Sequence, residues 1–170
     1  MSYEYIIWIA TFAYAFHVVE EYTLDWRDWA IAVLKLPVTW THFALVNALV
    51  VVLGVSCSAV GWSLPTYALA LPALMLINAT FFHVFPFIAT RGRFSPGLGS
   101  SVLLFYPIGI WAYWGAHLDG VLTTRVVLFS VLLGTALMAS PIVLLKLRFV
   151  PYFDQTGGRS KTSTRKAVRG

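Results

Sequence analysis

The sequence predicts an all-α protein, an integral membrane bundle of five transmembrane helices. Hydrophobic residues make up 59% of its 170 residues and charged residues only 11%, whereas a soluble chain carries about 25% charged residues. The apolar residues form long continuous runs, which favour membrane helices over the alternating pattern of a membrane barrel. The single cysteine, Cys57, excludes a disulfide framework and a thiolate metal site.

Five apolar runs supply the predicted helices, each near the ~20 residues that a helix needs to cross the hydrocarbon core. Between the first two runs, Trp26 and Trp29 indicate a short helix lying in the membrane interface. Residues 1–150 form the predicted membrane domain, and residues 151–170 a basic cytoplasmic tail without regular structure. The runs are Tyr3 to Tyr22, Thr39 to Trp62, Pro65 to Thr90, Gly99 to His117 and Thr124 to Phe149.

The distribution of cations predicts the orientation in the membrane. Five spans place the termini on opposite sides, so a cytoplasmic tail implies an external N-terminus. Eleven of the 12 Lys and Arg residues then lie in cytoplasmic segments, as the positive-inside rule favours, and only Arg125 is external. We therefore expect a multi-pass protein of the cell membrane. Its basic tail suits anionic lipid headgroups as partners better than nucleic acid.

His17, Glu20 and Glu21 are the most informative residues of the chain. Their spacing of i, i+3 and i+4 places them on one face of the first predicted helix. Charged side chains at membrane depth are costly, and they usually face a protein interior and serve a function. Two carboxylates beside an imidazole repel one another unless a cation or a shared proton lies between them. Carboxylate and imidazole are also common ligands of zinc and iron.

The predicted topology brings two further histidines, His42 and His83, to the same cytoplasmic depth, whereas His117 falls on the opposite side and is excluded. The cofactor we expect is a divalent metal, zinc or iron, as one or two ions. We expect its ligands to be His17, Glu20, Glu21 and His83, with His42 as a further candidate.

Simpler roles compete for several of these residues. His42 and His83, taken singly, could serve as hydrogen-bonding groups between helices. Asn47 and Asn78 are more typical of that task than of ligation, and we keep them as candidate substrate contacts.

Arg91 and Arg93 lie in the turn before the fourth run. They either supply positive-inside charge or form a clamp for an anionic headgroup over the mouth of a cavity. In the second case, the N–H groups that open the following helix would add donors.

Three motifs in order resemble the HXXEE-domain family of small bacterial membrane proteins. They are His17-Val-Val-Glu20-Glu21, Asn78 followed by His83, and Phe94-Ser-Pro96-Gly97, within about residues 5 to 115. The family pattern has Tyr where Phe94 stands, and a shorter gap between the Asn and the His. The resemblance implies a metal-binding, enzymatic protein of a bacterial inner membrane, without supplying a reaction.

The function we expect is a membrane-embedded metal-dependent enzyme acting near the cytoplasmic leaflet on a lipid or other apolar substrate. Hydrolysis by a metal-activated water is preferred, with Glu21 rather than Glu20 as the general base. A di-iron oxidoreductase that hydroxylates or desaturates a chain is the first alternative. A proton-coupled transporter, a structural role and a homo-oligomeric assembly are left open.

Overall fold

The structure is a computed structural model that describes residues 2–147 and residue 152. It is all-helical, with no strand among these residues. The chain divides into two compact units, residues 1–138 and 139–170. The basic tail predicted over residues 151–170 lies outside the described residues except for Tyr152, and the end of the fifth run at Phe149 also lies outside them.

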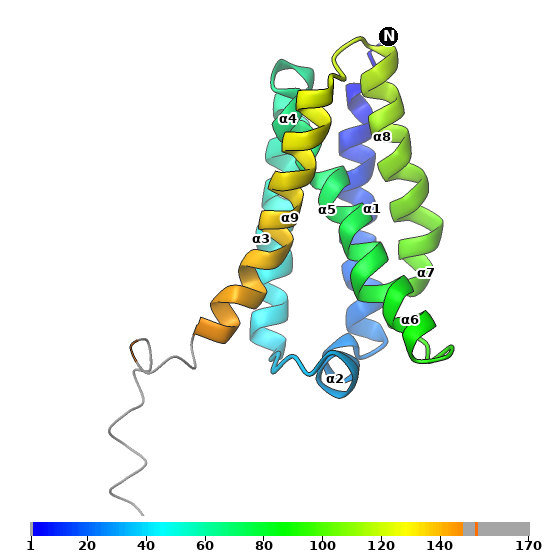
Figure 1. Ribbon diagram of the computed structural model, residues 1–170, viewed down its shortest axis with the longest axis vertical. Coiled ribbons are helices and arrows are strands. Elements are labelled where there is room, and N and C mark those ends of the chain that lie inside the picture. The colour runs from blue at the N-terminus through cyan, green and yellow to red at the C-terminus, as the bar shows by residue number, and fades with distance from the viewer. Residues whose placement is uncertain (1, 148–151, 153–170) are drawn as a thin grey trace, which may run out of the picture. The chain divides into compact units, whose positions relative to one another are not determined.

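Each of the five predicted runs forms a helical rod, and a π-helical turn interrupts the third and the fourth of them (Figure 1). A short helix between the first two runs, as predicted, is also present, as α2 continued by η2. The elements in chain order are η1 (Tyr3–Tyr5), α1 (Ile6–Thr23), α2 (Trp26–Trp29), η2 (Ala30–Leu34), α3 (Trp40–Val60), η3 (Gly61–Ser63), α4 (Pro65–Ala68), α5 (Ala70–Asn78), η4 (Ala79–Val84), α6 (Phe85–Ala89), α7 (Leu98–Ser100), η5 (Ser101–Phe105), α8 (Tyr106–Leu118) and α9 (Thr124–Leu147).

The core of the first unit lies around α1 and α5. Helix α5 is apolar on every side, and almost all of its residues are buried, as expected for a helix surrounded by others. Helix α1 packs against α3, α5 and α8. Small residues permit these contacts: a Cβ added at Gly54 of α3 would stand 2.8 Å from Oγ1 of Thr11, and one at Gly115 of α8 would stand 2.9 Å from Cδ1 of Ile6.

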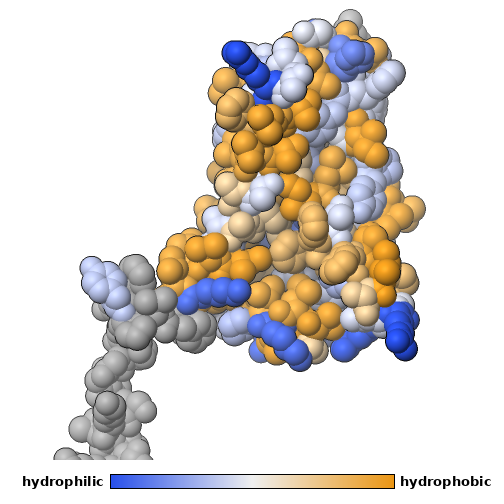
Figure 2. Space-filling model, in the orientation of Figure 1, coloured by the Kyte–Doolittle hydropathy of each residue, from blue (hydrophilic) through white to orange (hydrophobic). Residues whose placement is uncertain are grey.

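Three helices of the described chain, rather than five, are long and apolar enough to cross a membrane: Trp40–Ser63, Pro65–Ala89 and Thr124–Leu147. The first and fourth predicted spans are helical, but polar residues lower their mean hydropathy. In α1 these are His17, Glu20 and Glu21. Figure 2 shows hydrophobic side chains over the middle of the first unit, with hydrophilic ones at its two ends, on the face in view.

Asp119 fastens the elements at the end of the bundle where the chain begins. Its Oδ2 accepts hydrogen bonds from the N–H of Tyr3 at 2.6 Å, from Nε1 of Trp62 at 2.7 Å and from Oγ of Ser2 at 3.0 Å. One carboxylate therefore joins η1, η3 and the end of α8.

Candidate metal centre

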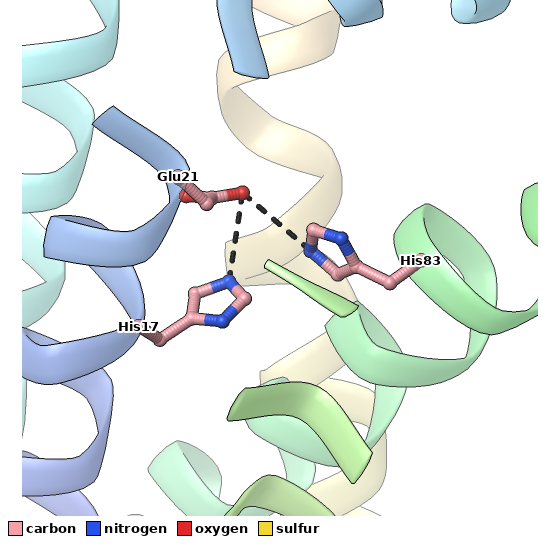
Figure 3. A group of neighbouring side chains, drawn as sticks. All are labelled: His17, Glu21 and His83. Carbon is pink, nitrogen blue, oxygen red and sulfur yellow. Dashed lines mark ion pairs between the residues drawn. The ribbon is translucent and has the colours of Figure 1, made fainter. Parts of the chain in front are cut away.

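His17, Glu21 and His83 meet inside the first unit, two from α1 and one from η4 (Figure 3). Oε1 of Glu21 lies 3.5 Å from Nε2 of His17 and 3.5 Å from Nε2 of His83. One ligand atom from each residue lies within 4.8 Å of the others. The residues are 1%, 4% and 0% exposed, so the three polar groups have been removed from water together.

The donor set and its spacing fit a metal ion. Nε2 of His17 and Nε2 of His83 are buried and have no hydrogen-bond partner, which is uncommon for polar atoms in a protein interior. Ligand atoms about 2.0–2.1 Å from a tetrahedral zinc ion lie about 3.4 Å apart. The observed 3.5 Å from each imidazole to the carboxylate is therefore close to the separation that a shared ion imposes.

The position of His83 follows from an irregular stretch of helix. His83 lies in the π-helical turn η4 (Ala79–Val84), and such turns often occur at functional sites. Pro86 follows it and lacks the N–H that would pair with the carbonyl of Phe82, four residues earlier. That carbonyl instead accepts a hydrogen bond from Oγ of Ser95 at 3.4 Å, and the same Oγ lies 3.0 Å from Nδ1 of His83.

The position of His17 depends on the start of the fourth rod, at α7. Nδ1 of His17 lies 2.7 Å from Oγ of Ser100. Glu20, three residues after His17, accepts hydrogen bonds from the N–H of Gly99 at 3.1 Å and of Ser100 at 2.7 Å, and a further short bond from the Ser100 hydroxyl. Its carboxylate thus binds the first N–H groups of the rod, a favourable place for negative charge.

Gly97 and Phe105 enclose the three side chains. Gly97 has a φ of +92°, in the left-handed region that favours glycine. A Cβ there would stand 2.6 Å from Cε1 of His83 and 2.7 Å from Cε1 of His17. The buried ring of Phe105 lies 4.3 Å from the ring of His17.

Of the five predicted ligands, the structure gathers His17, Glu21 and His83 and places the other two elsewhere. Glu20 faces Gly99 and Ser100 rather than the shared centre of the three. His42 is half-buried near the start of α3, and its Nδ1 lies 2.8 Å from Oγ1 of Thr39.

The predicted substrate contacts are also separate from the three ligands. Asn47 accepts a hydrogen bond from the Tyr14 hydroxyl at 2.7 Å, which joins α1 to α3. Asn78 is buried, and its Nδ2 faces Sδ of Met138 at 3.9 Å. Arg91 and Arg93 are exposed in the turn between α6 and α7. The sequence suggested that N–H groups at the start of the following helix would help these arginines to bind an anion. In the structure, the N–H groups of Gly99 and Ser100 are bonded to Glu20.

An apolar groove with a volume of about 420 Å³ lies between α1 and α3. Tyr14 connects it to the histidine cluster: the tyrosine hydroxyl donates to Asn47 in the groove, and the tyrosine ring lies 6.2 Å from the ring of His17. The groove is lined by Ala15, Val18, Val19, Tyr22, Trp40, Phe43, Ala44, Asn47, Ala48 and Val51.

Sequence reasoning missed Ser95, Gly97 and Ser100 as parts of the site. Two of them belong to the segment Phe94-Ser-Pro96-Gly97, which the sequence suggested as a family motif and as part of a turn that could bind an anionic headgroup, but not as a contact of the histidines. Its co-occurrence with the His-Glu-Glu motif was the available signal that the two segments meet.

Over the residues that the structure describes, the fold and the site define an all-helical protein with three helices of membrane-spanning length and a buried cluster of two histidines and a glutamate. The chain matches the model of a family described as a protein of unknown function with HXXEE motif over residues 8–112, more than half of its length. It therefore belongs to the HXXEE family, as its motifs predicted. No curated protein and no solved structure matches it.

Proposed function

We propose that the protein is a membrane-embedded metalloenzyme in which His17, Glu21 and His83 hold one divalent ion, zinc or iron. The observation that carries the proposal is the convergence of two unpartnered imidazole nitrogens on one buried carboxylate oxygen. A single shared proton would leave one imidazole lone pair facing the carboxylate. A divalent ion would satisfy all three groups at once.

The ligand set favours one metal ion and leaves room for chemistry. Within the part of the chain that the structure describes, these three residues form one group of three ligands, and Glu20 is bonded to Gly99 and Ser100. Two histidines and one carboxylate are the protein ligands of several catalytic zinc sites, which keep a fourth position open. An ion bound there would act as a Lewis acid and activate a water molecule.

The substrate we propose is a lipid or another apolar molecule at the cytoplasmic leaflet, and the reaction is a hydrolysis. The apolar groove beside α1 supports this substrate class, because its lining is almost entirely aliphatic and aromatic. Since Glu21 lies between the histidines, its geometry favours ligation over the general-base role that the sequence suggested. The alternative reaction is an oxidation, because two histidines and one carboxylate also form the iron site of many oxygenases.

We also propose that all five rods cross a bacterial inner membrane, with the N-terminus outside. The polar residues that lower the hydropathy of α1 include His17 and Glu21, which are buried. The outward side chains of α1 are apolar: Phe12, Phe16 and Val19 are 70%, 62% and 60% exposed. The cation asymmetry gives the orientation. In a Cys57→Ser background, cysteines placed at Gly92 and Gly120 should react with impermeant reagents from opposite sides, and reaction from one side would contradict this topology.

Metal analysis of the purified protein tests the proposed centre. We expect about one equivalent of zinc or iron per chain in the simplest occupancy of three ligands. A preparation that stays folded and active in chelator, without metal, would refute the proposal. Incubation with phosphatidylethanolamine and phosphatidylglycerol vesicles, with and without oxygen, then separates the reactions: hydrolysis proceeds in both, whereas oxidation requires oxygen.

A further inference from the structure

Ser100 contacts both a candidate metal ligand and a carboxylate that is not in the ligand group. Its Oγ lies 2.7 Å from Nδ1 of His17 and makes a short hydrogen bond to Oε2 of Glu20. The side chain is 4% exposed, so water does not compete for these contacts. Glu20 is itself fixed by the N–H groups of Gly99 and Ser100.

The partners of this hydroxyl determine which nitrogen of His17 carries the proton. Ser100 has one hydroxyl proton, and its other two neighbours, the Glu20 carboxylate and the Gly97 carbonyl at 3.3 Å, only accept. The short bond runs from the hydroxyl to Oε2 of Glu20, so the single proton is used there and the hydroxyl accepts from Nδ1 of His17. His17 is then protonated at Nδ1, and the lone pair of its Nε2 points at Glu21.

The second histidine is arranged in the same way by a different serine. Oγ of Ser95 donates to the carbonyl of Phe82 and is left to accept from Nδ1 of His83. Both imidazoles thus present a bare Nε2 to the same carboxylate oxygen. A hydrogen bond on the distal nitrogen of a metal-bound histidine fixes the ring and makes it a stronger ligand.

We propose that Ser100 is a positioning residue of the metal centre, coupling Glu20 to His17. Glu20 would hold the Ser100 hydroxyl, and the hydroxyl would hold the His17 ring with Nε2 free for the ion. The inference rests on the proposed metal site and explains why two adjacent glutamates occur in the motif. Glu21 binds the ion, and Glu20 orients a ligand through Ser100.

The test compares Ser100→Ala with Ser101→Ala in the full-length protein. Ser101 is the matched control because it is buried next door and its Oγ has no hydrogen-bond partner. Zinc affinity is measured by competition with a chelator. The protonated nitrogen of His17 is read from long-range ¹H–¹⁵N correlations of ¹⁵N-histidine protein without metal.

We expect Ser100→Ala to bind zinc about 10- to 100-fold more weakly, the usual loss for an outer-shell partner, and to lose the fixed Nδ1–H form of His17. Ser101→Ala should match the unmodified protein in both measurements. Should Ser100→Ala not fold, Glu20→Gln provides the same comparison, because Gln keeps the shape of Glu and weakens the bond to the hydroxyl.

The outcomes separate this inference from the proposed function. An unmodified protein that binds neither zinc nor iron refutes the metal centre, while the histidine spectrum still reports whether Ser100 orients His17. A protein that binds zinc, with His17 protonated at Nε2 when metal-free, overturns the role of Ser100 alone. Unchanged affinity in folded Ser100→Ala does so as well.

Discussion

Gly97 lies directly against the ring of His83, so that a Cβ on this glycine would stand 2.6 Å from Cε1 of the imidazole. At Gly97, the segment after α6 therefore meets the candidate centre with backbone alone. This relationship makes the size of residue 97 a direct probe of the histidine cluster.

Gly97→Ala should lower both the melting temperature and the metal affinity. The positive φ of +92° costs an alanine about 1–2 kcal/mol, and the new methyl group would displace His83 or His17. Gly120→Ala is the control, because Gly120 also has a positive φ, of +71°, but no atom within 4 Å of the added Cβ. It should lower stability through backbone strain and leave metal affinity unchanged. Equal metal affinity in both variants would argue against contact between residue 97 and the ligands.

Removing a ligand should have a larger effect on metal content than removing Ser100. We expect Glu21→Gln and His83→Gln to weaken zinc binding by more than the roughly 100-fold upper range for outer-shell partners. In chelator, Glu21→Gln should be as stable as the unmodified protein or more so, because a buried charge has been removed. His117→Gln is the control, since His117 is exposed on α8 and its ring contacts Trp114. If the His117 variant lost its metal and the other two variants kept theirs, the metal site would lie at the opposite end of the bundle from His17, Glu21 and His83.

The contact between α9 and α5 should tolerate no side chain at Gly134. A Cβ there would stand 2.8 Å from Cβ of Ala73 and 2.9 Å from the backbone nitrogen of Leu74. Overpacking of this kind typically costs about 1–3 kcal/mol, so Gly134→Ala should lower the melting temperature in detergent.

Gly109→Ala is the matched comparison for Gly134→Ala. Its Cβ would also meet atoms at 2.8 Å, but they belong to the side chain of Leu76, which can move. Replacing Gly by Ala in a helix raises the helix propensity equally at both positions. The difference between the melting temperatures of the two variants therefore reports the difference in packing around the added methyl group. A larger loss at Gly109 would contradict the close approach of α9 to α5.

Asp119 should make stability depend on pH in the acidic range. Desolvation opposes the shift, but hydrogen bonds from the Tyr3 N–H, the Trp62 indole and the Ser2 hydroxyl lower the pKa of Asp119. Since the folded pKa lies below the unfolded one, ionised Asp119 stabilises the fold above about pH 4, near the ordinary carboxyl pKa. This contribution is lost as the pH falls through the folded pKa.

Melting curves of Asp119→Asn from pH 7 downward test this dependence. The variant should melt below the unmodified protein at pH 7 and approach it in acid. Asp28→Asn is the control, because the Asp28 carboxylate is exposed and bonds to the adjacent Arg27 at 3.0 Å. A deficit of the Asp119 variant that is constant with pH would show that its charge is not the stabilising feature.

The sequence predicted the helices well, because each apolar run is long and its ends carry Pro, Gly or polar residues. The sequence also predicted that His17, Glu21 and His83 lie close together. A spacing of four residues fixes His17 and Glu21 on one helix face. Helical spacing alone cannot determine the direction of Glu20. Consecutive residues on a helix point about 100° apart, and the residues that meet Glu20, Gly99 and Ser100 of α7, lie about 80 residues later in the chain.

The serines that contact the histidines could not be predicted for the same reason. Their placement depends on the path of the chain between α6 and α7, where Gly92 and Gly97 both have positive φ. Membrane crossing by α1 is hard to predict from hydropathy for a different reason, which lies within the helix itself. The buried polar residues that form the site also lower the hydropathy of the helix that carries them.

The rod of α1 is tied to the rod of α7, η5 and α8 at both of its ends. At one end Asp119 holds Tyr3, and at the other Gly99 and Ser100 hold Glu20. Between them, the ring of Tyr14 stacks on Phe105 with ring centres 5.8 Å apart. Axial sliding or rotation of α1 would break both sets of hydrogen bonds together. The two rods therefore form a frame that fixes both the axial position and the rotation of α1, and with them the positions of the two candidate ligands that α1 carries, His17 and Glu21.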